Sequence, residues 1–449
     1  SKAALAESNV NTKILAKEAV ADSATPDAFI YFSLSQNDYS SGAEFNYVKE
    51  LKDSSGSEIA PEVQFFPEMT LRNYIKNMKH PALRKVQDLQ IICAMDLIHM
   101  AHDFRLELLN LTKMSNFEMR EYPNVHFSVI LDLSLNEDDC IYDVLFLLSM
   151  LSRLDNVDLR VFENEFTVGK AIFVVKDEFL ISGMLSGEDR CLSVIMCEGE
   201  KSVGEMYKVF SEMCNPKKLL FARKDIKDML STKEFMHALI SPQQRWLCGQ
   251  ITELLLPDDM IDEILPLVSD KIETDEAYIN YMKSVSKLIY GVMENNPLRI
   301  LIYENALYEF SVNGVINFLN VKIELNMEQK KRVLSHILQL SENPKVEIRL
   351  IHGRIVPDFR KIAPPSFVLS STVSFLVLHN DASDRNAYLE ISLPRMREIF
   401  GYFYEQLWDY EEGDIILSGK KMIDYVSYLL TSVEMLNLMN ELGINPSIN

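Results

Sequence analysis

Two stretches decide the fold: Asn156-Val157-Asp158-Leu159-Arg160-Val161 and, about 190 positions later, Lys345-Val346-Glu347-Ile348-Arg349-Leu350. After its first residue, each stretch has the order apolar, acidic, apolar, arginine, apolar. This alternation is typical of a β-strand with one buried face. The repetition of residue type and order at such a long period indicates two duplicated domains rather than a solenoid of short repeats.

The residues around the two stretches repeat as well. A helix with an asparagine N-cap precedes each strand, and it begins 24 positions before Arg160 at Asn136 and 23 positions before Arg349 at Asn326. A hairpin and a further strand follow in each copy. Each copy then closes in an aromatic helix, at 206–210 and at 399–403. We therefore predict an α/β protein made of two pseudo-repeated halves with added helical segments.

Composition limits the functions that fit this chain. It has 449 residues, of which 47% are hydrophobic, and 45 basic residues against 66 acidic ones give a net charge of −21. Such a chain has no broad basic face for nucleic acid, so we expect DNA contact only through a head that is absent or truncated here. We find no stretch of the roughly 20 apolar residues that a membrane helix needs. The six cysteines form no CxxC pair and are expected to be buried free thiols in a reducing cytoplasm.

The pattern of helices, strands and loops predicts six segments. These are an N-terminal helix, strand and loop, a helical segment, a first α/β half, a helical connector, a second α/β half and a C-terminal helix, at 1–67, 68–115, 116–217, 218–297, 298–412 and 413–449.

The stretch from Lys170 to Gly183, with the order of elements around it, resembles the phospholipase D-like fold, in which two such halves form one pseudo-symmetric unit. Members of that family carry His-x-Lys before this strand and an Asp five positions after the Lys. In this chain Lys170 and Gly183 fit, but Val168 stands at the His position and Val175 at the Asp position. The second copy has no His-x-Lys.

This resemblance implies that the fold is kept and the catalytic activity is lost, because valine can neither accept nor donate a proton. We therefore expect no catalytic residue, no cofactor and no metal. The expected function is that of a cytoplasmic regulatory or sensor protein, the effector-binding and dimerisation part of a bacterial transcription regulator. Two alternatives stay open: a phosphodiesterase-like hydrolase with a displaced site between the halves, and a protein–protein interaction scaffold.

Basic residues that follow the repeated strands are the candidate ligand-binding residues, and the expected ligand is a small anion, because ligands bind beyond the carboxyl ends of strands in α/β sheets. The other interpretation of this cluster is a solvated loop. The candidates are Arg160, Lys170, Arg349, His352, Arg354 and Lys361.

Two further features suggest other roles. Asp96, His99 and His102 are spaced as on one helix face, which would suit a metal, but packing histidines are the commoner explanation and we find no partner motif. The amphipathic helix expected over 419–441 carries several methionines and suggests a homodimer contact.

Overall fold

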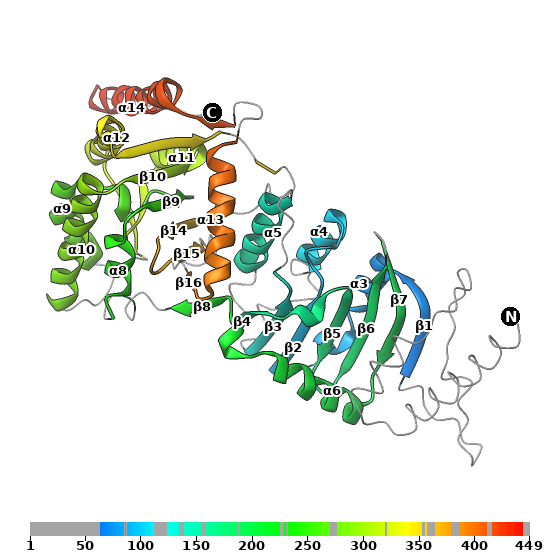
Figure 1. The fold of residues 1–449 in the computed structure, drawn as a ribbon. Coiled ribbons are helices and arrows are strands. Elements are labelled where there is room, and N and C mark those ends of the chain that lie inside the picture. The colour runs from blue at the N-terminus through cyan, green and yellow to red at the C-terminus, as the bar shows by residue number, and fades with distance from the viewer. Residues whose placement is uncertain are drawn as a thin grey trace, which may run out of the picture. The chain divides into compact units, whose positions relative to one another are not determined.

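The computed structural model describes residues 63–442, apart from 85, 87, 112–123, 134–138, 154–157, 187–188, 225–228, 230–231, 270–275, 319–320, 353–354, 357–363, 379–386 and 411–414. The chain forms two compact units. Unit 1 contains residues 1–139 and 153–220, and unit 2 contains 140–152 and 221–449. Each unit is built around one large sheet (Figure 1). The helix, strand and loop expected within 1–62 lie outside the described residues.

The sheet of unit 1 has seven strands in the order β1-β7-β6-β5-β2-β3-β4. Strands β2, β3 and β4 are parallel to one another, and β5, β6, β7 and β1 continue from β2 as an antiparallel series. The strands are β1 Val63–Thr70, β2 Asp88–Met95, β3 Asn124–Leu131, β4 Asp158–Glu163, β5 Lys170–Val175, β6 Phe179–Ser186 and β7 Arg190–Cys197.

The sheet of unit 2 has eight strands in the order β17-β13-β10-β9-β14-β15-β16-β8. The parallel strands here are β9, β10 and β13, and β14, β15, β16 and β8 continue as an antiparallel series. The strands are β8 Phe221–Lys224, β9 Gln244–Cys248, β10 Leu298–Tyr303, β13 Val346–Ile351, β14 Ser366–Leu369, β15 Phe375–Leu378, β16 Ala387–Ile391 and β17 Ile416–Leu417; β11 Val315–Phe318 and β12 Val321–Glu324 form a separate hairpin.

The two sheets share one topology, since β8, β9, β10, β13, β14, β15 and β16 repeat the order and direction of β1 to β7, and only β17 is extra. The registers agree as well. Arg160 on β4 aligns through β3 with Ile92 on β2, and Arg349 on β13 aligns through β10 with Leu247 on β9. The next residues, Cys93 and Cys248, therefore occupy equivalent positions. The predicted α/β protein with two related halves is confirmed at this level.

Helices cover the sheets and bury their apolar faces. In unit 1, Val203, Met206 and Phe210 of α6 pack on the sheet residues Ile92 and Val174. In unit 2, α9 to α12 and α14 contribute to one extended core. The helices are α3 Leu71–Asn77, α4 His102–Leu111, α5 Cys140–Arg153, α6 Glu200–Met213, α8 Glu234–Ile240, α9 Ile261–Ser269, α10 Glu276–Asn295, α11 Glu304–Asn313, α12 Met327–Glu342, α13 Pro394–Trp408 and α14 Gly419–Glu441. None of the helices in the described part of the chain is long and apolar enough to cross a membrane.

The helical interpretation of 68–115 and 218–297 is wrong in part. Strand β2 lies inside the first segment, and β8 and β9 lie inside the second. The run Ile91-Ile92-Cys93-Ala94 is buried on both faces of the sheet, so it lacks the alternation that marks a half-buried strand. The expected helix start at Asn136 lies outside the described residues, and α5 is observed from Cys140.

The six cysteines are free, as predicted. Five are buried and Cys214 is half-buried. Burial raises the pKa of Cys93 and that of Cys248 to about 12, so both stay protonated thiols at neutral pH.

The N-terminus of α12 is closed by a capping box. The Asn326 side chain accepts from the Gln329 backbone N–H at 2.9 Å, and the Asn326 N–H donates to the Gln329 side chain at 3.1 Å. We expect Asn326→Ala to lower the free energy of unfolding of unit 2 by about 1 kcal/mol, because the Gln329 N–H loses its acceptor. Urea denaturation followed by circular dichroism measures the change, and an unchanged midpoint would show that the cap adds no stability.

Candidate functional site

Three carboxylates mark the carboxyl ends of the parallel strands of unit 1. Asp96 follows β2, Asp132 follows β3 and Glu163 ends β4, and the three residues are 3%, 5% and 8% exposed. Lys218 Nζ lies 3.3 Å from a Glu163 oxygen. Ligands of α/β sheets bind at the carboxyl ends of the parallel strands, so we take this edge of the unit 1 sheet as the candidate site.

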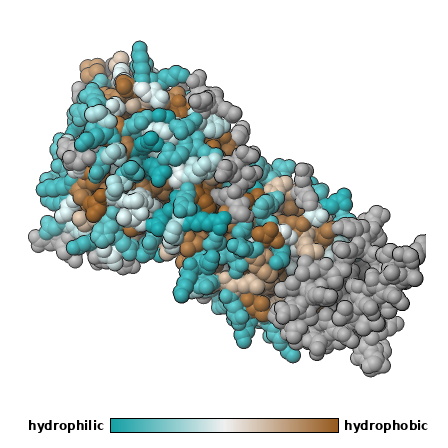
Figure 2. Space-filling model, in the orientation of Figure 1, coloured by the Kyte–Doolittle hydropathy of each residue, from teal (hydrophilic) through white to brown (hydrophobic). Residues whose placement is uncertain are grey.

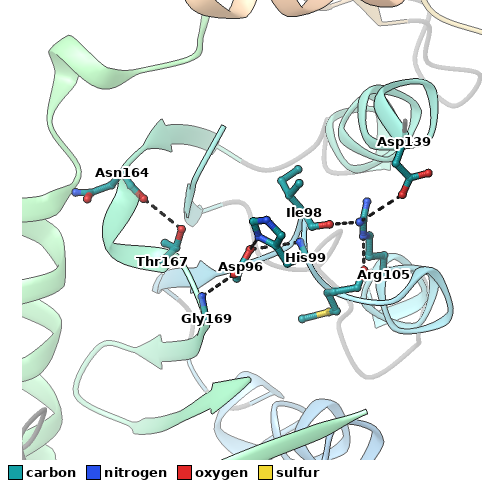
Figure 3. A network of polar contacts seen from close by, with 9 residues as sticks. Asp96, Ile98, His99, Arg105, Asp139, Asn164, Thr167 and Gly169 are labelled. Carbon is teal, nitrogen blue, oxygen red and sulfur yellow. Dashed lines mark hydrogen bonds and ion pairs between the residues drawn. The ribbon is translucent and has the colours of Figure 1, made fainter. Parts of the chain in front are cut away.

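Asp96 holds a histidine in place. One of its oxygens, Oδ1, lies 2.7 Å from His99 Nδ1 and 3.3 Å from the His99 backbone nitrogen, while Oδ2 accepts from the Gly169 N–H at 2.6 Å. Figure 3 shows the His99 ring and Gly169 approaching this carboxylate from two sides. The carboxyl group is buried but the His99 side chain is 54% exposed. Since Nδ1 is engaged, the hydrogen bond presents Nε2 as the nitrogen available to a ligand.

The turn between β4 and β5 supplies the other side of this site. The Asn164 side chain accepts from the Phe166 N–H at 3.0 Å. The Thr167 hydroxyl donates to the Asn164 carbonyl at 3.2 Å, as Figure 3 shows. Gly169 has a φ of 66°, a left-handed conformation that glycine adopts without strain. This conformation is part of the turn that points the Gly169 N–H at Asp96.

Lys170 begins β5 directly after this turn. Its carbonyl accepts from the Asp96 N–H at 2.9 Å, which joins the two strand ends. Its ammonium donates to the Phe166 carbonyl at 2.9 Å and lies 3.6 Å from the centre of the Phe166 ring. Burial lowers the pKa of Lys170, because the charged amine is partly removed from water. The side chain is therefore a cation held close to the edge of the site.

A second polar group lies beside the loop that carries His99. His102 Nε2 is 2.7 Å from Asp139 Oδ2. Arg105 is buried; its Nε donates to the Met100 carbonyl at 2.7 Å, its guanidinium also bonds the Ile98 carbonyl, and it lies 4.0 Å from Asp139 (Figure 3). Arg105 thereby fixes the loop from Asp96 to the start of α4.

The metal interpretation of Asp96, His99 and His102 gains no geometric support. The loop after β2 is not helical, and the two histidines face different carboxylates, Asp96 and Asp139. Within the described ranges no group of three or more His, Cys, Asp or Glu side chains is placed to hold a metal ion.

The two valines that depart from the resembled motif have different surroundings. Val168 lies in the turn next to Gly169 and is 50% exposed, so its isopropyl group faces solvent beside the site. Val175 is buried at the end of β5, 1% exposed. Neither position brings a proton-transferring group to this edge of the sheet.

Arg160 and Arg349, the predicted ligand-binding arginines, are ion-paired in the same way in both units. Arg160 Nη2 is 3.0 Å from Asp158, and Arg349 Nη2 is 2.7 Å from Glu347, the acid two positions earlier on the same strand. Arg349 also donates to the Trp408 carbonyl at 2.7 Å, and its guanidinium lies 4.2 Å from the centre of a Trp408 ring. The repeated acidic-x-Arg pattern therefore forms an ion pair within one strand in each unit.

Within each unit, the predicted site residues that the structure describes do not meet at one place. Three strand spacings of about 4.8 Å each separate Arg160 on β4 from Lys170 on β5, roughly 14 Å. His352 follows β13 and pairs with Glu304 at the start of α11, on the strand face opposite to Arg349. Arg354 and Lys361 lie outside the described residues. Of the two predicted residues in unit 1, Lys170 is the one beside the Asp96–His99 pair.

No protein-family model matches this chain, and the comparison with curated proteins finds no match.

Proposed function

We propose that the chain is a non-catalytic regulatory protein of degenerate tandem phospholipase D-like fold, the effector-binding part of a bacterial transcription regulator. One observation carries this proposal. The two units keep one strand topology, while the position that would supply the reacting histidine holds Val168, half-exposed beside the site. A duplicated shape that persists without its proton-transfer groups favours binding over turnover.

The proposed effector is a small anion at the carboxyl end of β2. The His99 Nε2 is the exposed polar atom of the Asp96–His99 pair, and the Lys170 ammonium provides positive charge nearby. The buried Asp96 orients the ring and keeps the anion from approaching the sheet closely. A phosphate or carboxylate group fits the Lys170 cation, and a doubly protonated His99 ring would add an Nε2–H donor to it.

The test is a melting-temperature titration with inorganic phosphate and with a phosphate monoester. At a concentration 100 times the dissociation constant, a ligand adds about 2.7 kcal/mol to stability, which corresponds to several degrees for a unit of this size. Lys170→Met should remove most of the shift, and Lys201→Met, an exposed lysine of α6, should leave it intact. Because the pKa of Lys170 is lowered, the shift should fade with rising pH earlier than an ordinary lysine would allow. If both lysine variants respond as the wild type does, no anion binds at this site.

A hydrolase is the second candidate, and one observation favours it. A buried carboxylate holds a half-exposed histidine at 2.7 Å, and this is the arrangement of a general base. The discriminating assay is hydrolysis of a bis-aryl phosphate by the wild type, by His99→Asn and by Lys170→Ala. Turnover that disappears in His99→Asn would replace the regulatory proposal with an enzymatic one.

A further inference from the structure

A second histidine held by a carboxylate lies in unit 2, at the carboxyl ends of its parallel strands. Glu304 follows β10 directly, and His352 follows β13 directly. The His352 Nδ1 atom is paired with the Glu304 Oε2 atom. The side chains of His352 and Glu304 are 53% and 19% exposed, so a small molecule can reach both. The pair lies at the same edge of its sheet as the Asp96–His99 pair of unit 1.

Three tyrosines lie around the Glu304 carboxylate. Tyr308 comes four residues after Glu304 on α11, and Tyr428 comes three residues after Tyr425 on α14; these are the spacings of neighbours on one helix face. The helices α11 and α14 pack against each other. Tyr425 donates its hydroxyl to Glu304. Burial and Glu304 raise the pKa of this hydroxyl most, and Tyr308 and Tyr428 add to the effect, so the three phenol groups are neighbours.

Two of these tyrosine rings are open to solvent. Tyr308 and Tyr428 are 55% and 67% exposed, whereas Tyr425 packs against the core of unit 2. Where α14 lies at the upper left of Figure 1, Figure 2 shows hydrophobic side chains among hydrophilic ones. This part of the surface therefore offers aromatic rings together with a carboxylate. We call Glu304, Tyr308, His352, Tyr425 and Tyr428 the Glu304 site.

The polar groups of the Glu304 site attract positive charge. A carboxylate has about four lone-pair sites, so Glu304 can accept further hydrogen bonds beside those from His352 and Tyr425. In the neutral His352 ring, Nδ1 donates to Glu304, which leaves Nε2 as an acceptor. The faces of the Tyr308 and Tyr428 rings attract cations. Among the ion pairs of the described residues, Glu304 takes part only in the one with His352, so no described lysine or arginine neutralises it.

We propose that the Glu304 site binds a small organic molecule through its primary ammonium group. Such a group carries one positive charge and three N–H donors, which match the Glu304 carboxylate and the His352 Nε2 acceptor. The alkyl part of the molecule then packs on Tyr308 and Tyr428. The net charge of −21 also favours the approach of a cation. The site does not depend on the anion proposed for unit 1.

Saturation-transfer difference NMR of the whole chain with n-butylammonium chloride is the test. The wild type should bind this probe saturably, with a Kd on the order of millimolar for so small a molecule, whereas uncharged n-butanol should give no saturable signal. Glu304→Gln keeps the shape of the side chain, removes its charge and should weaken binding about tenfold. Tyr428→Leu removes an aromatic face at an exposed position, where it should not disturb folding, and should weaken binding about threefold.

Glu309→Gln is the matched control. It removes an exposed carboxylate of α11 one residue after Tyr308, changes the net charge by the same amount and should bind the probe as the wild type does. Equal melting temperatures of the two glutamine variants would show that both are folded. Equal binding of n-butylammonium by the wild type, Glu304→Gln and Tyr428→Leu would overturn the proposal, as would a wild-type signal no larger than that of n-butanol. Much tighter binding of a short lysine-containing peptide would replace the small molecule with a lysine side chain of a protein partner.

Discussion

Replacing Phe400 by alanine is expected to lower the free energy of unfolding of unit 2 by about 3–5 kcal/mol. Phe400 is fully buried on α13, at 0% exposure. Its ring makes edge contacts with Phe221, Phe367 and Phe403 at centroid distances of 6.2, 5.7 and 6.4 Å. The alanine variant loses the transfer free energy of the ring, these contacts and the filling of the space it occupied.

The matched control lies on the same helix. Tyr402 is 42% exposed, so Tyr402→Ala removes a comparable ring with little loss of packing and should change stability by no more than about 0.5 kcal/mol. Chemical denaturation followed by tryptophan fluorescence suits both variants, because Trp246 and Trp408 are buried in unit 2. Similar losses in the two variants would mean that helix propensity, and not the aromatic cluster, holds α13.

Gly249→Ala is expected to destabilise unit 2 by about 3 kcal/mol or more. A Cβ atom at this position would lie 1.9 Å from the Pro364 carbonyl oxygen and 2.8 Å from the Pro365 carbonyl oxygen. These are backbone atoms of two residues whose φ is fixed by the ring, so the clash cannot be relieved by a change of rotamer. The Gly249 N–H also donates to the Ser366 hydroxyl at 2.9 Å, a bond that a backbone shift would lengthen.

Gly291 provides the opposite control. It lies inside α10, and a Cβ atom there would meet nothing within 4 Å. Gly291→Ala should therefore raise stability by about 0.5–1 kcal/mol, because alanine is the better helix former. Thermal unfolding of both variants gives the two signs in one experiment. A folded Gly249→Ala protein with an unchanged melting temperature would mean that the Pro364–Pro365 segment yields easily.

The sequence predicted the two halves of the fold about equally well. The two repeated strands and the helix that begins at Asn326 were predicted to within a few residues, and they are observed as β4, β13 and α12. The repeat was also predicted, but only from the helix that precedes β4. The strands β2 and β9, which come earlier in each copy, were missed. Both are buried central parallel strands, but they share few residue types, so the sequence alone shows no repeat there.

The candidate site could be predicted only in part. The sequence spacing singled out Asp96 and His99, but as residues of one helix face; in the structure they meet across a loop. Their remaining partners are far away along the chain: Gly169 is 73 positions from Asp96. One sequence carries no signal for such a contact. The basic cluster around Arg349 was predicted as a ligand site. In the structure Arg349 pairs with Glu347, because both side chains lie on one face of the strand.

Cys93 and Cys248 occupy equivalent positions, so each sheet contains a thiol whose modification can report the opening of that sheet. Both thiols sit on the first of three parallel strands, at 5% and 3% exposure, and protonation keeps them unreactive while the strand stays paired. A thiol reagent can modify them only when the sheet opens. The rates at which the two residues are modified therefore compare the opening of two sheets of the same topology within a single molecule, each measured at the equivalent strand position.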